Sequence, residues 1–181
     1  MATAPTLPLV SVEEYLRTSY EPNCEYLDGV LISKAMPDRI HGRLQALLIG
    51  FLLAQEELFG FESLSEQHIR ISPTRFRIPD VSVLTQPPTD GRYLDDRTPP
   101  LFTIEIASLE EPWPTLRAKL SDHLAMGVSL VIIADPYNKT VMVATQIEPL
   151  HELPSPLIVN IPVPDKGALK IDFDELYRKL G

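Results

Sequence analysis

Apolar side chains recur at helical spacing over residues 40–59, where they cover one broad face of a predicted helix. Gly60 is a typical residue for ending that helix. A second helix is predicted over residues 112–126, and prolines open this segment, as the start of a helix tolerates. Its expected buried residues are Trp113, Leu116, Leu120 and Leu124.

Two hairpins are predicted in the first half of the chain. The first has Asp28-Gly29 between two apolar runs, which is a strong hairpin signal. The second joins a strand over residues 61–72 to a strand over residues 76–84 as an antiparallel pair. Pro79 lies inside this pair and indicates an edge, a bulge or a bend, because proline cannot donate a hydrogen bond to a strand ladder.

The second half begins with a βαβ pattern, in which apolar strands over residues 101–108 and 128–134 flank the 112–126 helix. The remaining predicted elements are a strand over 140–145, a loop with weak strand character over 146–166, a strand over 169–171 and a helix after Asp172. We therefore expect an α/β fold of the α+β kind, with a central mixed sheet flanked by helices. We expect one domain over residues 1–181, of which residues 1–10 form an extended arm.

Composition narrows the class of protein. A chain of 181 residues suits one compact domain, and its single cysteine, Cys24, excludes an internal disulfide and a cysteine-rich zinc site. No apolar run approaches the ~18 residues of a membrane helix, and the start lacks the features of a signal peptide, so we expect a cytoplasmic protein. The net charge of -9 argues against a broad nucleic-acid-binding surface, although a local basic strip or a bound metal would still permit a nuclease.

Three charged residues in largely apolar segments form the candidate site. Asp80 follows Pro79 in one strand, Glu105 lies in the middle of the strand LFTIEIAS, and Lys119 lies in the next helix. A carboxylate among Ile and Phe side chains is costly to bury unless it is paired or bound to a metal. Simple alternation would also let Glu105 point to a solvated face, and Lys119 could extend past the core to water.

If the two strands are neighbours, Asp80 and Glu105 supply the two carboxylates that Mg²⁺ commonly uses, and the Ile106 carbonyl is a candidate third ligand. Such a metal polarises a phosphoryl oxygen and lowers the pKa of a bound water that attacks it. A nearby lysine orients that water or stabilises the charge of the transition state. Taken alone, Glu25 suits a solvated strand carboxylate, and His41 suits a structural or capping histidine.

A family resemblance is carried by the ordered segments EYLDGVL (25–31), His41, IPDVSVL (78–84), IEIAS (104–108), and KLSDHLAMGV (119–128) with VIIADP (131–136). Together they resemble the PD-(D/E)XK nuclease core over roughly residues 11–145. More narrowly, they resemble the family named "putative restriction endonuclease domain", formerly a domain of unknown function. The resemblance implies a restriction-endonuclease-like core and a metal-dependent endonuclease that cuts DNA, uses Mg²⁺ or Mn²⁺ and works as a homodimer.

The resemblance also implies roles for individual residues. Asp80 and Glu105 are the implied metal ligands, and Glu25 is an implied supporting acid that binds a second metal or contacts the attacking water. The general motif has a lysine two residues after the glutamate, where this chain has Ala107. In the narrower family the lysine resembles one that has moved onto the following helix, which is the place of Lys119.

The sequence departs from the family pattern at two helix positions. Thr115 stands where an acidic residue is common, and His123 stands where tyrosine is common. With the acidic net charge and Ala107, these departures favour a rival interpretation, a catalytically degenerate binding or regulatory module with the nuclease fold. A third interpretation is a hydrolase of a phosphate substrate other than DNA, which would tolerate the negative surface better.

Overall fold

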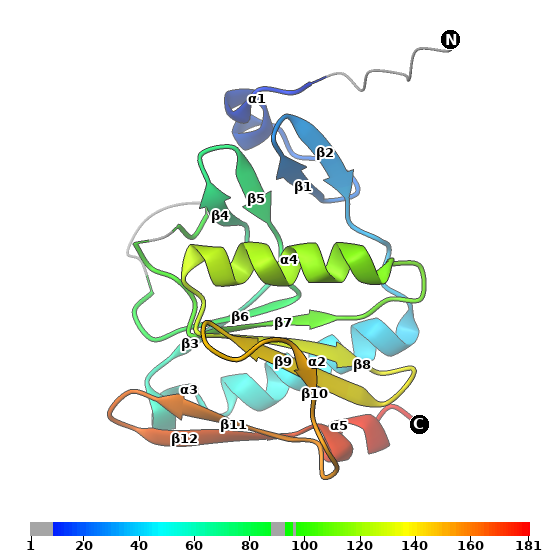
Figure 1. The fold of residues 1–181 in the computed structure, drawn as a ribbon, viewed down its shortest axis with the longest axis vertical. Coiled ribbons are helices and arrows are strands. Elements are labelled where there is room, and N and C mark those ends of the chain that lie inside the picture. The colour runs from blue at the N-terminus through cyan, green and yellow to red at the C-terminus, as the bar shows by residue number, and fades with distance from the viewer. Residues whose placement is uncertain (1–8, 88–92, 96) are drawn as a thin grey trace.

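The computed structural model describes residues 9–87, 93–95 and 97–181, and Figure 1 shows the arrangement of its elements. The helices are α1 (Val12–Arg17), α2 (Arg39–Leu53), α3 (Glu56–Phe59), α4 (Trp113–Met126) and α5 (Phe173–Arg178). The strands of the first half are β1 (Cys24–Leu27), β2 (Val30–Ser33), β3 (Glu62–Ser65), β4 (Ile69–Ser72), β5 (Arg75–Arg77) and β6 (Val81–Leu84). Those of the second half are β7 (Phe102–Ile106), β8 (Leu130–Asp135), β9 (Thr140–Thr145), β10 (His151–Glu152), β11 (Ile158–Val163) and β12 (Gly167–Asp172).

The centre of the molecule is a mixed sheet in the strand order β10-β9-β8-β7-β6-β3. The pair β7 and β8 is parallel and is connected through α4, whereas the other neighbours in this sheet pair antiparallel. A parallel pair needs such a crossover because its strands run in the same direction. The predicted βαβ unit and the mixed sheet flanked by helices are therefore confirmed.

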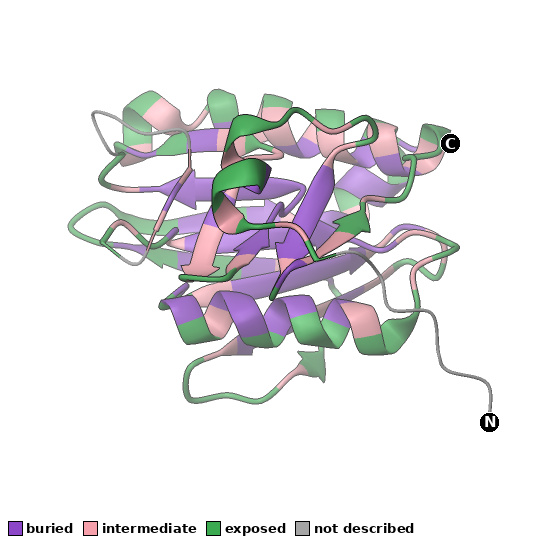
Figure 2. Cartoon of the chain, turned by 90° about the horizontal axis from the view of Figure 1, so that it is seen from above, coloured by how far each residue is buried: buried purple, intermediate pink, exposed green. Residues whose placement is uncertain are grey.

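Helices α2 and α4 cover opposite faces of the central sheet. Ile104 and Ile106 pack in one apolar cluster with Leu48 of α2. Val131 and Ile133 pack in a second cluster with residues of α4. Figure 2 shows buried residues running through the central strands and exposed residues on the outer sides of the helices. Because both faces of this sheet are covered, alternation along β7 gives no solvated face, and Glu105 is buried.

A smaller sheet, in the order β2-β1-β5-β4, lies beyond α4 at the end of the molecule that carries α1 (Figure 1). The antiparallel hairpin predicted over residues 61–84 is confirmed, but it is interrupted, and its two halves belong to different sheets. Strands β4 and β5 pair in the small sheet, and β3 pairs with β6 in the central one. The chain crosses from one sheet to the other at Ile78-Pro79-Asp80, where proline ends the ladder as its missing N–H requires.

Two further predictions need correction. The helix expected over residues 40–59 is interrupted after Leu53, and a separate turn of helix, α3, ends at Gly60 in the left-handed conformation. Residues 146–166 contain β11, whose alternating buried residues pack with β12 against the α2 side of the core. The segment predicted as loop with weak strand character therefore contains a regular strand, which this packing stabilises.

The turn signal at Asp28-Gly29 is confirmed. Asp28 and Gly29 both adopt positive φ in the β1–β2 turn, as a two-residue hairpin of this type requires. The Ser11 hydroxyl accepts a hydrogen bond from Glu14 N–H at the start of α1. Of the arm predicted for residues 1–10, residues 1–8 lie outside the described residues. In the described ranges, no helix is both long and apolar enough to cross a membrane.

Candidate functional site

Asp80 and Glu105 come together through the register of β6 and β7. Val81 pairs with Ile104 in this antiparallel ladder, so the next residue outward, Asp80, lies opposite Glu105. The Ile106 N–H donates to Asp80 Oδ2 over 2.7 Å, which fixes the carboxylate at the end of the ladder. Both side chains are buried, with Asp80 3% and Glu105 1% exposed.

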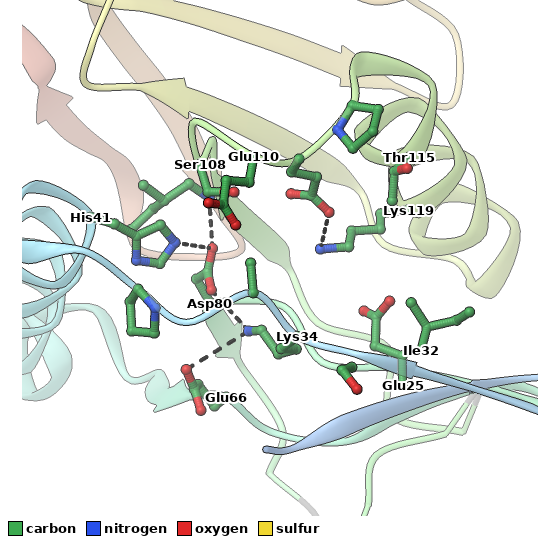
Figure 3. Close-up of a pocket in the computed structure, with 16 residues that line it drawn as sticks. Glu25, Ile32, Lys34, His41, Glu66, Asp80, Ser108, Glu110, Thr115 and Lys119 are labelled. Carbon is green, nitrogen blue, oxygen red and sulfur yellow. Dashed lines mark hydrogen bonds and ion pairs between the residues drawn. The ribbon is translucent and has the colours of Figure 1, made fainter. Parts of the chain in front are cut away.

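Asp80 has two basic neighbours besides this backbone contact (Figure 3). Lys34 Nζ donates to Asp80 Oδ1 over 2.9 Å, and His41 Nε2 lies 3.4 Å from Asp80 Oδ2. Burial by itself would raise the pKa of Asp80, but the contacts with His41, Lys34 and the Ile106 N–H together hold that pKa below its usual range. Asp80 is therefore a carboxylate at neutral pH.

Glu105 also has two basic neighbours, and both come from α4. His123 Nε2 lies 2.9 Å from Glu105 Oε1, and Lys119 Nζ lies 3.5 Å from Glu105 Oε2. Burial opposes the charge on Glu105, but Lys119 and the His123 hydrogen bond lower its pKa. His123, at the position where the family commonly has tyrosine, is thus a direct partner of one of the two carboxylates.

Lys119 is buried in α4, and so are Asp122 and His123, whereas Trp113 is 37% exposed. The prediction that Trp113 is buried is therefore wrong. The buried side of α4 instead includes charged side chains beside the site. Lys119 Nζ lies 2.7 Å from Glu111 Oε1 in addition to its contact with Glu105. Burial would lower the pKa of Lys119, but the surrounding glutamates raise it, so the ammonium form persists.

Glu25 belongs to a buried ion network beside these groups. Arg77 Nη1 donates to Glu25 Oε2 over 2.6 Å, and the Ile78 N–H donates to Glu25 Oε1 over 3.1 Å. Arg77 also binds Asp122 of α4 through Nε, at 2.7 Å. This network joins β1, β5 and α4. It places the Glu25 carboxylate at the edge of the site with both oxygens already accepting hydrogen bonds.

A cavity of about 280 Å³ opens onto this group of residues (Figure 3). Its charged and ionisable lining consists of Glu25, Lys34, His41, Glu66, Asp80, Glu110, Glu111 and Lys119. Ile106 lines it as well, whereas Glu105 is not among the lining residues. The predicted residues Asp80, Glu25, Ile106 and Lys119 therefore share one cavity, and Glu105 contacts one of them, Lys119.

The donor set suits a hard divalent cation. Within the ranges that the structure describes, no three His, Cys, Asp or Glu side chains form a ready-made metal cage. Mg²⁺ does not need one, because it commonly binds through one or two carboxylates and keeps several waters. Asp80, which directly precedes β6, and Glu105 of β7 are two ionised carboxylates, and Ile106 follows Glu105 on the same strand. The residues present therefore fit such an ion.

Sequence reasoning missed several partners of these residues. Lys34, Arg77 and Glu111 each contact a predicted site residue, and Asp122 binds Arg77. Arg77 directly precedes Ile78-Pro79 in the segment FRIPDVSVL, and a charged residue at this position was a usable signal. No local signal marks Lys34, whose partner Asp80 is 46 residues away in the sequence.

The fold and this pair of carboxylates beside a lysine define a nuclease-like domain of the restriction-endonuclease type. The family model Uma2, described as "Putative restriction endonuclease", matches residues 12–161, and the chain belongs to this family. A similar solved structure is that of "a putative nuclease belonging to DUF820 from Anabaena variabilis ATCC 29413". It shares 22% sequence identity with a TM-score of 0.80, covering 95% of this chain and 99% of the other. No curated protein matches the chain.

Proposed function

We propose that the chain is a metal-dependent endonuclease that hydrolyses phosphodiester bonds of DNA with a metal-activated water. The observation that carries this proposal is the placement of Asp80 opposite Glu105, both ionised and buried, with Lys119 Nζ 3.5 Å from Glu105. Burying an unpaired carboxylate costs free energy. A fold that keeps two buried carboxylates together therefore needs cations beside them. Membership in a family described as restriction endonucleases supports the same reaction class.

Asp80, Glu105 and the carbonyl oxygen of Ile106 would hold Mg²⁺ or Mn²⁺. When bound, such an ion polarises the scissile phosphoryl group and lowers the pKa of its bound water. The chain contributes the position of the two carboxylates, which the β6–β7 ladder and the Ile106 N–H fix in place. It also keeps both carboxylates ionised, because basic side chains lower their pKa values despite burial.

Lys119 acts through its charge. Its raised pKa keeps it an ammonium, so it orients the attacking water or stabilises the transition-state charge and does not serve as a general base. Glu25 supports it at a distance, because the Glu25 carboxylate is one of the charges that raise the pKa of Lys119. Arg77 and the Ile78 N–H hold Glu25 in that position.

The partners follow from the reaction. Cutting both strands of a duplex suits a two-fold symmetric homodimer, and a cytoplasmic location suits a nuclease of this kind. A second candidate substrate class is a phosphate diester other than duplex DNA. The lining of the cavity favours this second substrate class, because Glu66, Glu110 and Glu111 would repel a polyanion such as duplex DNA.

Metal binding and cleavage test the proposal together. Calorimetry with Mg²⁺ and Mn²⁺ compares the wild type with Asp80→Asn, Glu105→Gln and the control Asp165→Asn, which changes an exposed residue in the β11–β12 turn. We expect binding in the wild type and the control and its loss in the two site variants. Cleavage assays on supercoiled DNA, single-stranded DNA, RNA and a small phosphodiester then identify the substrate class.

Two results would count against the proposal. If both site variants bound metal and cleaved DNA like the wild type, the assigned site would be wrong. If the wild type neither bound metal nor cleaved any of these substrates, the binding or regulatory interpretation would replace the enzyme.

A further inference from the structure

The ammonium group of Lys34 lies among oxygen atoms at the edge of the cavity. It is 2.9 Å from Asp80 Oδ1, 3.0 Å from the Ile78 carbonyl oxygen and 3.8 Å from Glu66 Oε1. Figure 3 shows Lys34 between Asp80 and Glu66. Two carboxylates and a carbonyl are also the oxygen donors that a hard divalent cation takes. These oxygens hold the Lys34 ammonium against Asp80, which is one of the two carboxylates assigned to the metal ion.

The backbone of Lys34 is held, while its side chain has room to move. Lys34 follows β2, and its N–H donates to the carbonyl of Asn23 over 2.9 Å, which ties it to the hairpin. The side chain is 12% exposed and lines the cavity of about 280 Å³. A lysine has four rotatable methylene groups, so rotation about them can carry the ammonium from Asp80 into the cavity without moving β2.

We propose that Lys34 is a resident cation of Asp80, and that a divalent metal ion binds this carboxylate by displacing the Lys34 ammonium into the cavity. This inference rests on the proposed metal-dependent function and adds the exchange that precedes it. The physical reason is that a divalent ion at Asp80 Oδ1 would lie close to the Lys34 ammonium, and like charges repel strongly in a buried site. Lys34 thus stabilises the metal-free fold and weakens the binding of metal.

Chemical labelling of the wild-type protein tests the displacement directly. Lysine acetylation is measured by peptide mass spectrometry in EDTA and in saturating Mg²⁺, with the exposed Lys170 as internal reference. We expect Mg²⁺ to increase the labelling of Lys34 relative to Lys170, although bound ligands usually protect nearby groups. Labelling that stays constant or falls would overturn the inference. The variant Asp80→Asn provides a positive control, in which Lys34 labels readily without metal.

Metal affinity gives a second, independent readout. Lys34→Met removes the ammonium, and Lys34→Gln keeps a hydrogen-bond donor without the charge. Lys170→Met is the matched control on an exposed strand residue. We expect Lys34→Met to bind Mn²⁺ about tenfold more tightly than the wild type, because the ion no longer displaces a charge-assisted hydrogen bond. In EDTA the same variant should melt at a lower temperature, and Mn²⁺ should raise its melting temperature more than that of the wild type.

The outcomes separate the inference from the function on which it rests. Tighter binding in Lys34→Met, with Lys34→Gln intermediate and Lys170→Met unchanged, would support the displacement. Equal or weaker binding in both Lys34 variants, while the wild type binds Mn²⁺, would overturn the inference and leave the proposed function standing. Absence of Mn²⁺ binding in the wild type and in every variant would overturn both.

Discussion

The carboxylate of Glu111 lies 2.7 Å from the ammonium of Lys119, although Glu111 precedes α4 and Lys119 lies two turns inside it. The family pattern commonly has its acidic residue one helical turn before this lysine, where the chain has Thr115. Glu111 reaches the same ammonium from outside the helix. Lys119 therefore has an acidic partner in this chain although residue 115 is threonine.

Replacing Glu111 by glutamine should release Lys119 from its shortest ionic contact. We expect Glu111→Gln to lower the free energy of unfolding by about 1–2 kcal/mol, since a charge-assisted hydrogen bond is lost. Adding Thr115→Asp should restore part of this loss by placing an acid one turn before the lysine. Urea unfolding measures both effects. The adjacent exposed residue gives the control Glu110→Gln, and identical behaviour of the two glutamine variants would refute the pairing.

The buried pair of His123 and Glu105 predicts a large stability effect. Both residues are at most 1% exposed, and His123 Nε2 lies 2.9 Å from Glu105 Oε1. His123→Leu should cost about 3–5 kcal/mol, because it leaves a buried carboxylate with one partner fewer. The double variant with Glu105→Gln should lose less than the sum of the two single changes. Strict additivity in denaturant unfolding would show that the two side chains do not interact.

Arg77 should matter more for stability than Arg75, although both bind Asp122. Arg77 is 2% exposed and contacts Glu25 as well, whereas the Arg75 side chain is 38% exposed. Arg77→Met leaves two acidic groups near the core without their shared partner, so we expect a loss of about 3–5 kcal/mol. Arg75→Met should cost clearly less, because its ion pairs are screened by water. Equal losses in thermal unfolding would contradict the assignment of Arg77 as the central link between β5 and α4.

Acid should destabilise the metal-free protein through Asp80 and Glu105. Burial would raise the pKa of each, but their basic partners lower it below the unfolded value of about 4. A carboxyl group with a lowered native pKa contributes its full stability above the unfolded pKa and loses it as the pH falls toward the native one. We therefore expect the free energy of unfolding to decrease as the pH falls below about 5.

The comparison with Asp80→Asn isolates the contribution of one carboxylate. The amide cannot titrate, so the dependence on pH should be shallower in this variant than in the wild type, in EDTA and at every pH below about 4. Urea titrations at a series of pH values measure this slope. The exposed-site variant Asp165→Asn should keep the slope of the wild type. Parallel curves for Asp80→Asn and the wild type would contradict the lowered pKa.

The sequence by itself determined the order and kind of the elements near the site. Periodicity marked α4, β7, β8 and β9, because the spacing of apolar side chains follows the local geometry of a helix or strand. Turn and cap residues marked the β1–β2 hairpin and the start of α5, since each acts within a few residues of itself. The ordered motifs also identified Asp80, Glu105 and Lys119 together as candidate site residues.

The hydrophobic pattern was insufficient where pairing with another segment decides the structure. Residues 61–84 form one interrupted hairpin whose two nested pairs lie in two sheets, and alternation within the segment carries no information on which sheet a strand will join. Residues 158–163 lie in a segment with several prolines that was predicted as loop with weak strand character, yet they form a regular strand that pairs with β12 over the α2 side of the core. In both cases burial against distant elements outweighs the local preference of the chain.

Only the tertiary structure decided which charges meet. Lys34 reaches Asp80 across 46 residues, and Arg77 reaches Glu25 across 52. Such contacts depend on strand register and on the angle at which α4 crosses the sheet. The local periodicity of apolar residues predicts neither quantity. The buried carboxylates were visible in the sequence as exceptions to an apolar pattern. The cations that make their burial possible became visible only when the strands and helices were packed together.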